Sequence, residues 1–502
     1  MSTVYDIVVI GAGPGGYVAA IRGVQLGLKV AVVEKDKPGG ICLNLGCIPS
    51  KALIHQAELV HSISELEELG LKVDTSGLDY GKAFAKSRKA AERLSKGVQF
   101  LLKKNNIEYI KATATIAAPD RVELSDGSSL QTRSIILATG SRPRQLPGLP
   151  FDEQRVLSSS GALLLEKLPR RIAVIGGGAI GLELAYVWRS FGAEVTIIEA
   201  LERLAPLEDP EVSAFLATAF RKQGINIFTG TLASPLEAPT ADGKNSTSAT
   251  APIKLVLKPA AASGSALPGA ASAASADPSA SPTVPGTPDS LEIDAVLVAV
   301  GRVPNSENLG LEQLGIRSQR GFVETGAWCQ TAAQGIYAIG DLVNTPLLAH
   351  VASKEGELAA EHIAHVLKGT ALPAMSNIQR DTVPSAIYCK PEVGSFGFTE
   401  EQAKAAGHKV SSFSFPYRGI GKAVATEKAD GFIKLTADAE TGELLGAAIA
   451  GEQATELIHE LLLARQNELT IEEIADLMHA HPTLSEGVME AARGVLGRAI
   501  HV

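Results

Sequence analysis

Cysteine is scarce in this chain, and its scarcity excludes two classes of protein. Four cysteines occur among 502 residues, too few for the disulfide framework of a small secreted protein. Apart from His479 and His481, no cysteine or histidine cluster has the spacing of metal ligands. Cys329 and Cys389 stand alone in their segments and are expected to be buried single thiols. We therefore expect neither a disulfide-stabilised fold nor a metal site.

Long apolar runs and an excess of positive charge are also missing. No apolar run approaches the ~18 residues that a membrane helix needs. The formal net charge of -9 disfavours a nucleic-acid partner, because we find no basic stripe that would neutralise phosphates. The first predicted strand begins almost at the N-terminus, which leaves no room for a cleaved signal. We expect a globular, cytoplasmic enzyme of about two to four domains.

Glycine, in contrast, forms a recognisable pattern near the N-terminus. The run 7–16 is a short apolar strand that enters Gly-x-Gly-x-x-Gly, and residues 17–22 read as a helix. Gly11 permits the tight turn, Gly13 lets the backbone approach a pyrophosphate, and Gly16 allows the helix to pack closely on the strand. The N-terminus of the helix would stabilise the phosphate charge.

An acid completes this pattern. Residues 30–33 read as a second strand that ends at Glu34, where a carboxylate can accept hydrogen bonds from a ribose hydroxyl. The strand, helix and terminal acid together predict a dinucleotide site far more specifically than the glycines alone.

The same pattern recurs in the middle of the chain. A strand at 172–175 leads into Gly176, Gly178 and Gly181, and Glu199 closes the strand after the next helix. The first glycine and the acid are separated by the same interval in both copies, 11 to 34 and 176 to 199. Two such units imply two nucleotides, a bound flavin adenine dinucleotide and a diffusible nicotinamide. The carboxylate at 199 favours NAD, because NADP needs a basic residue for its phosphate.

Two cysteines, Cys42 and Cys47, lie five positions apart just beyond the first copy. A step of five rotates side chains on a regular helix well apart, so bridging them would require local distortion, consistent with Gly46 and Pro49. A distorted, accessible disulfide is labile and suited to catalysis. Lys51 follows and is either a solvated lysine or a positive charge beside the flavin.

A candidate base lies near the C-terminus, in residues 479–486. Thiol–disulfide exchange needs a thiolate, and histidine titrates in the range that can generate one. A carboxylate partner would orient the ring, and His481 with Glu486 fits this role. Thr483 and Glu486 also have the spacing of a capping box for a helix over 487–496, and both roles can hold together.

One segment does not fit any core. Residues 259–288 are almost entirely Ala, Ser, Pro, Gly and Thr, with little large apolar surface to offset the entropy of ordering. The segment separates strand-like runs at 253–257 and 291–300, so we predict an enlarged, flexible surface loop.

These residues resemble the flavin disulfide reductases, and within them the dihydrolipoamide dehydrogenases, over nearly the whole chain. The motifs occur in family order: GAGPGG, GGICLNLGCIPSK, ATGS, GGGAIGLE, AVGRVPN, GIYAIGD and HAHPTLSE. The resemblance implies an α/β protein with two Rossmann-like dinucleotide-binding domains and a C-terminal α+β dimerisation domain. The expected bounds are 1–145 for the FAD-binding domain, completed by about 291–349, 146–290 for the NAD-binding domain, and 350–502 for the interface domain.

The resemblance also implies a set of cofactor contacts and a catalytic cycle. One tightly bound FAD per subunit is implied at Gly11, Gly13, Gly16, Glu34, Lys51, Ala114, Gly140, Asp341 and Ala349. NAD is implied at Gly176, Gly178, Gly181, Glu199 and Gly301, with Glu183 pairing with Lys51 beneath the flavin.

In the implied cycle the enzyme is a homodimer, and His481 serves the partner's cysteines. His481 deprotonates dihydrolipoamide, the thiolate attacks Cys42, and Cys47 is left as a thiolate against the flavin, from which hydride passes to NAD⁺. The expected partners are lipoyl domains of 2-oxo-acid dehydrogenase acyltransferases or the carrier protein of the glycine cleavage system, with no nucleic acid and no membrane.

Three alternatives are weaker. A glutathione reductase is expected to carry a basic residue for NADP near Glu199, and a mercuric reductase to carry extra cysteines near the C-terminus, where residues 497–502 have none. A non-catalytic scaffold that retains FAD would not need both cysteines together with His481 and Glu486.

Overall fold

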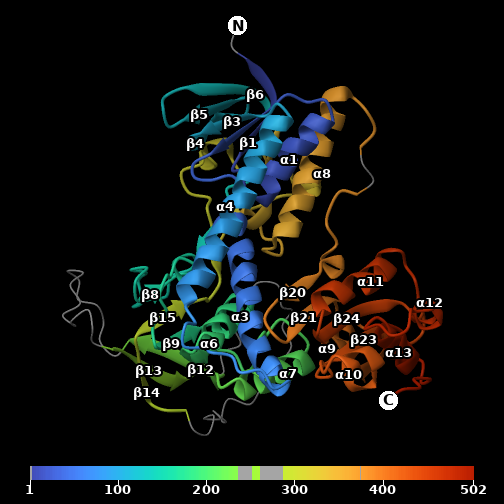
Figure 1. Ribbon diagram of the computed structural model, residues 1–502. Coiled ribbons are helices and arrows are strands. Elements are labelled where there is room, and N and C mark those ends of the chain that lie inside the picture. The colour runs from blue at the N-terminus through green and yellow to red at the C-terminus, as the bar shows by residue number, and fades with distance from the viewer. Residues whose placement is uncertain (1–2, 236–251, 261–286, 373–374) are drawn as a thin grey trace. The chain divides into compact units, whose positions relative to one another are not determined.

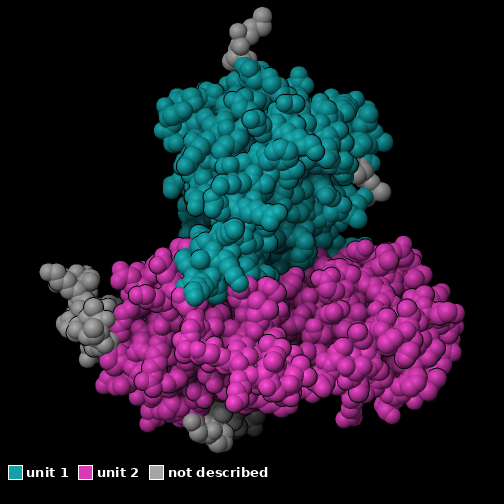
Figure 2. All heavy atoms as spheres, viewed as in Figure 1, with its two compact units in different colours: residues 1–53, 81–144, 301–379 teal, residues 54–80, 145–300, 380–502 magenta. Residues whose placement is uncertain are grey.

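The computed structural model describes residues 3–235, 252–260, 287–372 and 375–502. The chain forms two compact units, each assembled from three segments (Figure 2). The first unit comprises residues 1–53, 81–144 and 301–379, and the second comprises 54–80, 145–300 and 380–502. Our prediction of a surface loop falls on residues 261–286, outside the described residues. No helix within the described ranges is both long and apolar enough to cross a membrane.

The first unit is built on a mostly parallel sheet in the order β3-β2-β1-β6, with β19 on the other side of β6. All five residues of β2 are buried, as expected for a strand that is covered on both faces. The N-terminal half of β6 continues into an antiparallel meander with β5 and β4. The strands are β1 (Val4–Ile10), β2 (Val30–Glu34), β3 (Glu108–Lys111), β4 (Ala114–Ala118), β5 (Arg121–Leu124), β6 (Ser129–Leu137) and β19 (Ile336–Ala338).

Two helices of the first unit, α1 (Pro14–Gln25) and α8 (Ala349–Lys368), lie side by side (Figure 1). Their first turns meet through glycine, because a Cβ at Gly15 would lie 2.8 Å from the carbonyl oxygen of Ala352. Further along, Arg22 pairs with Glu361 at 2.7 Å, so the helices run in the same direction. Both N-termini therefore lie at the same end of the pair.

The long helix α4 (Tyr80–Lys104) completes this layer of the first unit. Its Val98 and Leu102 share a core cluster with Ala19 of α1, Ile363 of α8 and Ile7 of β1. Smaller elements of this unit are β7 (Ser141–Pro143), β16 (Arg302–Pro304), β17 (Ser318–Gln319) and β18 (Phe322–Val323).

The second unit contains a further parallel sheet, in the order β11-β10-β9-β15-β8, and a three-stranded antiparallel sheet. The strand-like run over 291–300 contains two strands. They are separated at Asp294, whose carboxylate accepts a hydrogen bond from the Arg171 backbone N–H at 2.9 Å. The elements are β8 (Val156–Leu157), α5 (Ser159–Ala162), β9 (Arg171–Ile175), α6 (Ala179–Ser190), β10 (Glu194–Ile198), α7 (Pro210–Lys222), β11 (Asn226–Phe228), β12 (Thr231–Pro235), β13 (Ile253–Pro259), β14 (Ser290–Ile293) and β15 (Ala295–Val298).

The two parallel sheets repeat one another in strand order and register. In the first, Ile10 of β1 pairs with Val33 of β2. In the second, Ile175 of β9 pairs with Ile198 of β10. Each of these residues directly precedes the first glycine or the acid of its copy, so the register places the fingerprint glycine opposite the acid in both units. The recurrence seen in the sequence is thus a structural repeat.

The C-terminal part of the second unit is an antiparallel sheet in the order β20-β21-β24-β23-β22. Every residue of its central strand β24 is buried. Its elements are β20 (Ser385–Ile387), β21 (Glu392–Gly397), α9 (Glu400–Ala405), β22 (Val410–Pro416), α10 (Gly421–Ala425), β23 (Phe432–Asp438), β24 (Leu444–Gly451), α11 (Ala454–Gln466), α12 (Ile471–Asp476) and α13 (Glu486–Val495).

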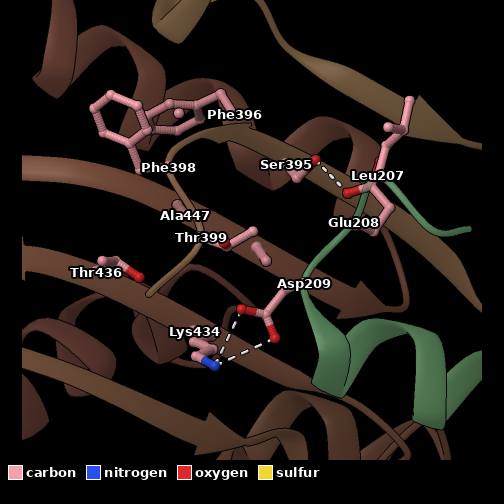
Figure 3. A pocket seen from close by; sticks show the side chains of 12 residues that line it. Leu207, Glu208, Asp209, Ser395, Phe396, Phe398, Thr399, Lys434, Thr436 and Ala447 are labelled. Atoms are coloured by element: carbon pink, nitrogen blue, oxygen red, sulfur yellow. Dashed lines mark hydrogen bonds and ion pairs between the residues drawn. The ribbon is translucent and has the colours of Figure 1, made fainter. Parts of the chain in front are cut away.

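Residues 207–209 pack against this sheet and line a small pocket (Figure 3). The buried carboxylate of Glu208 accepts hydrogen bonds from Ser385 and Ser395 at 2.8 and 2.6 Å. Burial raises the pKa of Glu208, although the two serine hydroxyls act in the opposite direction. Beside it, Asp209 pairs with buried Lys434 at 3.1 Å. This pocket contains none of the predicted site residues. It lies where residues 207–209 contact the antiparallel sheet of the same unit.

Residues 349–368 form α8 in the first unit, whereas we had placed residues from 350 onward in the interface domain. The predicted division into three domains, with its bounds, stays a prediction.

Candidate functional site

The first glycine loop has the geometry that its sequence predicts. Gly11 has a φ of 107°, and a Cβ there would lie 2.2 Å from the carbonyl oxygen of Ala138. A Cβ at Gly16 would lie 1.9 Å from the Gly11 carbonyl oxygen, so the helix packs closely on the turn. At Gly13 a Cβ would meet nothing within 4 Å. The middle glycine therefore borders open space, as the backbone must if a phosphate is to approach it.

The second loop reproduces this arrangement. Gly176 has a φ of 111°, and its Cβ would lie 2.4 Å from the carbonyl oxygen of Ala299. The Cβ of Gly181 would lie 2.0 Å from the Gly176 carbonyl oxygen, and that of Gly178 would again meet nothing within 4 Å. Both loops thus fit a dinucleotide phosphate at the N-terminus of a helix.

The terminal acids of the two copies fix these loops. The Glu34 carboxylate accepts a hydrogen bond from the Ala12 N–H at 2.7 Å, and Glu199 accepts one from the Gly177 N–H at 2.6 Å. Both acids are buried. We predicted an acceptor for a ribose hydroxyl and missed this contact to the loop. Because each carboxylate oxygen can accept two hydrogen bonds, the predicted ribose contact is compatible with it.

The two cysteines lie at a break between helices. α2 (Gly40–Leu45) carries Cys42, and α3 (Cys47–Glu68) begins with Cys47. Gly46 separates them with φ -150° and ψ -114°, so the local distortion that we predicted is present. The two Sγ atoms lie 2.7 Å apart. A Cβ at Gly40 would lie 2.8 Å from the Cα of Gly13, so the cysteine segment packs directly on the first glycine loop.

The two sulfurs differ in their electrostatic surroundings. The pKa of the Cys42 thiol is raised, first by its hydrogen bond with Cys47 and then by burial, while the charge of Lys51 acts in the opposite direction. Cys47 is the first residue of a 22-residue helix, where the partial positive charge of the N-terminus favours a thiolate. Cys47 is therefore the better placed of the two to carry negative charge.

The helix α4 supports the cysteine segment from one side. The Arg88 guanidinium donates a hydrogen bond to the carbonyl oxygen of Asn44 at 2.7 Å, and the Ser95 hydroxyl donates to the carbonyl oxygen of Pro38 at 2.8 Å. Neither residue was predicted, because a contact across 44 or 57 positions leaves no periodic signal in the sequence.

Three predicted motifs of the first unit meet around Asp341. The Ser141 hydroxyl donates to the Asp341 carboxylate at 2.5 Å, and Arg302 Nε donates to the Ser141 hydroxyl oxygen at 2.6 Å. Gly140 and Gly301 precede Ser141 and Arg302, and β7 and β16 pair antiparallel directly after them. The structure therefore brings Gly140, Gly301 and Asp341 into one unit.

The N-terminus of α8 borders this cluster. Ala349 is its first residue, and the carboxylate of Glu355, which is 3% exposed, accepts a hydrogen bond from the Gly340 N–H at 2.6 Å. Burial raises the pKa of Glu355 to about 7, and the charge of Asp341 acts in the same direction. We did not single out Glu355, since an acid within a helical run normally faces water. Ala114, the other predicted contact, is buried at the start of β4.

The predicted base pairs with the predicted acid in the second unit. His481 Nδ1 lies 2.8 Å from a Glu486 carboxylate oxygen, and the His481 side chain is 76% exposed. Burial acts to raise the pKa of Glu486, but hydrogen bonds from the Thr483 N–H and from His481 outweigh it, so this pKa lies below its usual value. The dyad is thus formed and accessible.

The predicted capping box at this turn is wrong in part. α13 begins at Glu486 with Ser485 as its N-cap. The Thr483 hydroxyl instead donates to the carbonyl oxygen of Ala480 at 2.8 Å. The Glu486 half of the box is present, because its carboxylate accepts the Thr483 N–H at 2.8 Å. The acid therefore fixes the turn that carries His481.

Some predicted site contacts involve both units and stay predictions. Cys42, Cys47 and Lys51 belong to the first unit, whereas Glu183 and His481 belong to the second. Glu183 is buried on α6, where its carboxylate accepts a hydrogen bond from the Tyr388 N–H at 3.2 Å. Of the lone cysteines, Cys389 is buried and Cys329 is partly exposed.

Comparison with known families agrees with this geometry. A family model described as pyridine nucleotide-disulphide oxidoreductase matches residues 5–257 and 267–356, and a model of that family's dimerisation domain matches residues 383–492. The chain belongs to the pyridine nucleotide-disulphide oxidoreductases. Membership implies the use of a flavin and a nicotinamide cofactor, and confirms the predicted family and fold class.

Curated relatives extend over the full length of the chain. Dihydrolipoyl dehydrogenase from Thermus scotoductus is 42% identical over 99% of both chains. The enzymes of the same name from Zymomonas mobilis and Bacillus subtilis are 39% and 38% identical over all of both chains. The predicted resemblance to this group is therefore confirmed.

Solved structures share the fold. LpdA from Mycobacterium tuberculosis superposes with a TM-score of 0.81 at 25% identity, covering 98% of this chain and 99% of that one. The HOCl-induced flavoprotein disulfide reductase RclA from Escherichia coli, as its Cu(II) complex, has a TM-score of 0.79 at 24% identity, covering 98% and 100%. At that identity the second likeness concerns the fold alone.

Proposed function

We propose that this enzyme oxidises protein-bound dihydrolipoamide to lipoamide through a disulfide between Cys42 and Cys47, and passes the electrons through FAD to NAD⁺. The observation that carries the proposal is the sulfur pair, 2.7 Å apart at a helix break, on a segment that packs against a dinucleotide loop. Full-length relatives named dihydrolipoyl dehydrogenase support the substrate.

The first unit would hold FAD. Gly13 borders open space beside the cysteine segment, and the N-termini of α1 and α8 lie at the same end of a parallel pair. Two helix N-termini there favour the negative charge of a pyrophosphate and of a reduced flavin. Bound at this place, FAD supplies an acceptor for two electrons and a hydride donor for NAD⁺.

The second unit would hold NAD. Gly178 borders open space in the same way, and the acid at the end of β10 is Glu199. A carboxylate at this position would repel the 2′-phosphate of NADP and accept a hydrogen bond from the free hydroxyl of NAD. We therefore assign NAD as the preferred nucleotide.

The cysteines would exchange with the substrate in two steps. A substrate thiolate attacks Cys42 Sγ, the bond between the two cysteines breaks, and Cys47 leaves as a thiolate at the N-terminus of α3. The second substrate thiolate then attacks the mixed disulfide, lipoamide leaves, and Cys42 Sγ takes up a proton. The substrate is oxidised by two electrons, and the cysteine pair is reduced by two.

His481 would accept the proton from the substrate thiol. Its Nδ1 faces Glu486, so Nε2 points away from the carboxylate and can serve as the base. We further propose a cytoplasmic homodimer in which His481 serves the cysteines of the second copy. Its partners would be lipoyl domains of 2-oxo-acid dehydrogenase acyltransferases or the carrier protein of the glycine cleavage system.

A steady-state assay tests this function. Purified enzyme with dihydrolipoamide and NAD⁺ should form NADH, and Cys42→Ser should lower turnover by at least ~10³-fold while flavin stays bound. Cys389→Ala is the matched control, because it removes a buried thiol that is not part of the predicted pair, and it should keep its activity. Unchanged turnover in Cys42→Ser, or a strong preference for NADP⁺, would contradict the proposal.

A further inference from the structure

The helix α4 carries an unusual concentration of positive charge. Eight of its residues are Lys or Arg, and Glu92 is its one acid. Six of the basic residues follow alternating steps of four and three positions, interrupted once by Phe100. We call this set the basic stripe: Lys82, Lys86, Lys89, Arg93, Lys96 and Lys103. Side chains spaced in this way share one face of a helix.

The basic stripe faces solvent and is long. All six of its residues are exposed, and at 1.5 Å per residue the stripe extends over about 30 Å. We expected no basic stripe from the sequence, because its members are dispersed among other residues, although we predicted a helical stretch near residues 82–104.

Among the described residues, internal ion pairs leave part of this charge unpaired. Lys96 pairs with Glu92 at 2.6 Å. Within the described part of the chain, Lys82, Lys89 and Arg93 form no ion pair, although the protein as a whole carries a net charge of -9. A local positive surface on an acidic molecule directs an acidic partner to one place, because the rest of the surface repels that partner.

The opposite face of α4 holds the redox segment. Arg88 and Ser95 donate hydrogen bonds to the carbonyl oxygens of Asn44 and Pro38, on either side of Cys42. A partner bound to the basic stripe would therefore lie one helix diameter, ~10 Å, from the segment that carries the reactive sulfurs.

We propose that the basic stripe is the docking surface for the acidic carrier protein that delivers the dihydrolipoyl group, an inference that rests on the proposed function. An apolar side chain within the stripe favours a protein over a nucleic acid. Phe100 lies in line with the stripe and is 65% exposed. A protein surface can cover both kinds of side chain, whereas a phosphate backbone offers contacts to the charges alone.

The test compares a carrier-bound substrate with a free one. In Lys82→Glu/Lys89→Glu/Arg93→Glu, kcat/KM for a purified, reduced lipoyl domain of net negative charge should fall at least tenfold at low ionic strength. The value for free dihydrolipoamide should stay within twofold. Added salt should slow the wild-type reaction with the carrier and leave the variant nearly unchanged, because screening removes an attraction that the variant lacks.

A matched control variant distinguishes an effect of the basic stripe from an effect of the protein's net charge. Lys72→Glu/Lys167→Glu/Lys258→Glu changes the charge by the same amount at exposed lysines outside α4, and it should keep the wild-type rate with the carrier. An equal loss in the control, no loss in the α4 variant, or tighter binding of the stripe to duplex DNA than to the carrier would overturn the proposal. Failure of the wild type to oxidise free dihydrolipoamide would instead refute the proposed function.

Discussion

At the scale of single residues, the two cysteines owe their different properties to the backbone around them. Gly46 ends one short helix and lets the next begin at Cys47, so Cys47 lies at a helix N-terminus while Cys42 lies within the preceding turn. The sulfurs meet because this break cancels the rotation that five helical steps would impose. The chemical asymmetry of the pair is thus a consequence of where the helices end.

The second residue-scale feature is the dyad of His481 and Glu486, and it gives a kinetic prediction. His481→Gln should slow reduction of the enzyme by dihydrolipoamide by ~10²–10⁴-fold, the usual contribution of a general base. Rapid-mixing absorbance of the flavin measures this step directly. His459→Gln, which alters an exposed histidine on α11, should react at the wild-type rate. A loss of less than tenfold in His481→Gln would assign His481 a structural role.

Residue patterns predicted the parts of the site that are local in sequence. The glycine loops, the terminal acids, the cysteine pair and the histidine–glutamate dyad each lie within a short segment with its own chemical logic. Arg88, Ser95 and Glu355 could not be predicted, because each acts through a contact with a distant segment. Their importance depends on tertiary packing, which composition and spacing do not encode.

At the scale of elements, sequence patterns predicted the strands and helices that flank the two glycine loops, but not all the ends of the predicted elements. The apolar run over 291–300 reads as one strand, yet Asp294 divides it by accepting a hydrogen bond from the neighbouring strand. Likewise α13 begins at Glu486, and Thr483 does not cap it. Element boundaries depend on single side-chain hydrogen bonds, for which a sequence offers several equivalent partners.

The helix α8 carries a pH-dependent contribution to stability. The pKa of Glu355 is raised to about 7 by burial, so the folded protein holds a proton that the unfolded chain releases near pH 4.5. Stability should therefore fall as pH rises between about 5 and 7, by on the order of 3 kcal/mol, and then level off. Glu355→Gln keeps an acceptor for the Gly340 N–H and should remove this decline.

Tryptophan fluorescence can follow this effect in the first unit. The chain has two tryptophans. In a Trp188→Phe background, Trp328, which stacks on His362 of α8, reports on the first unit alone. Urea midpoints of the flavin-loaded protein between pH 5 and pH 8 should decline in the parent and stay level in Glu355→Gln. Glu357→Gln, an exposed acid on the same helix, is the control and should decline like the parent. A parallel decline in all three would show that Glu355 does not titrate in this range.

At the scale of the whole molecule, the chain uses one dinucleotide-binding design twice. Both copies share strand order, register, a glycine turn with positive φ, and an acid that accepts a loop N–H. The copies differ in what surrounds them. The cysteine segment packs against the first loop, so a cofactor held there can exchange electrons with sulfur. Among the described residues of its own unit, the second loop has no cysteine pair beside it, which suits a nucleotide that enters and leaves.

If the first loop binds FAD and the second binds NAD, equivalent substitutions in the two loops should have different consequences. Gly13 and Gly178 have φ values of -68° and -80°, which any residue adopts, and a Cβ at either would meet nothing within 4 Å. Valine at either position should therefore leave the fold intact and fill the space of a pyrophosphate.

Gly13→Val should be purified without flavin. Gly178→Val should be yellow and reducible by dihydrolipoamide. It should form NADH at least ~10²-fold more slowly, because the substitution blocks the binding site of the nucleotide that accepts the hydride. Absorbance at the flavin band and NADH formation distinguish the two, and loss of flavin from Gly178→Val would mean that the two loops do not serve separate cofactors.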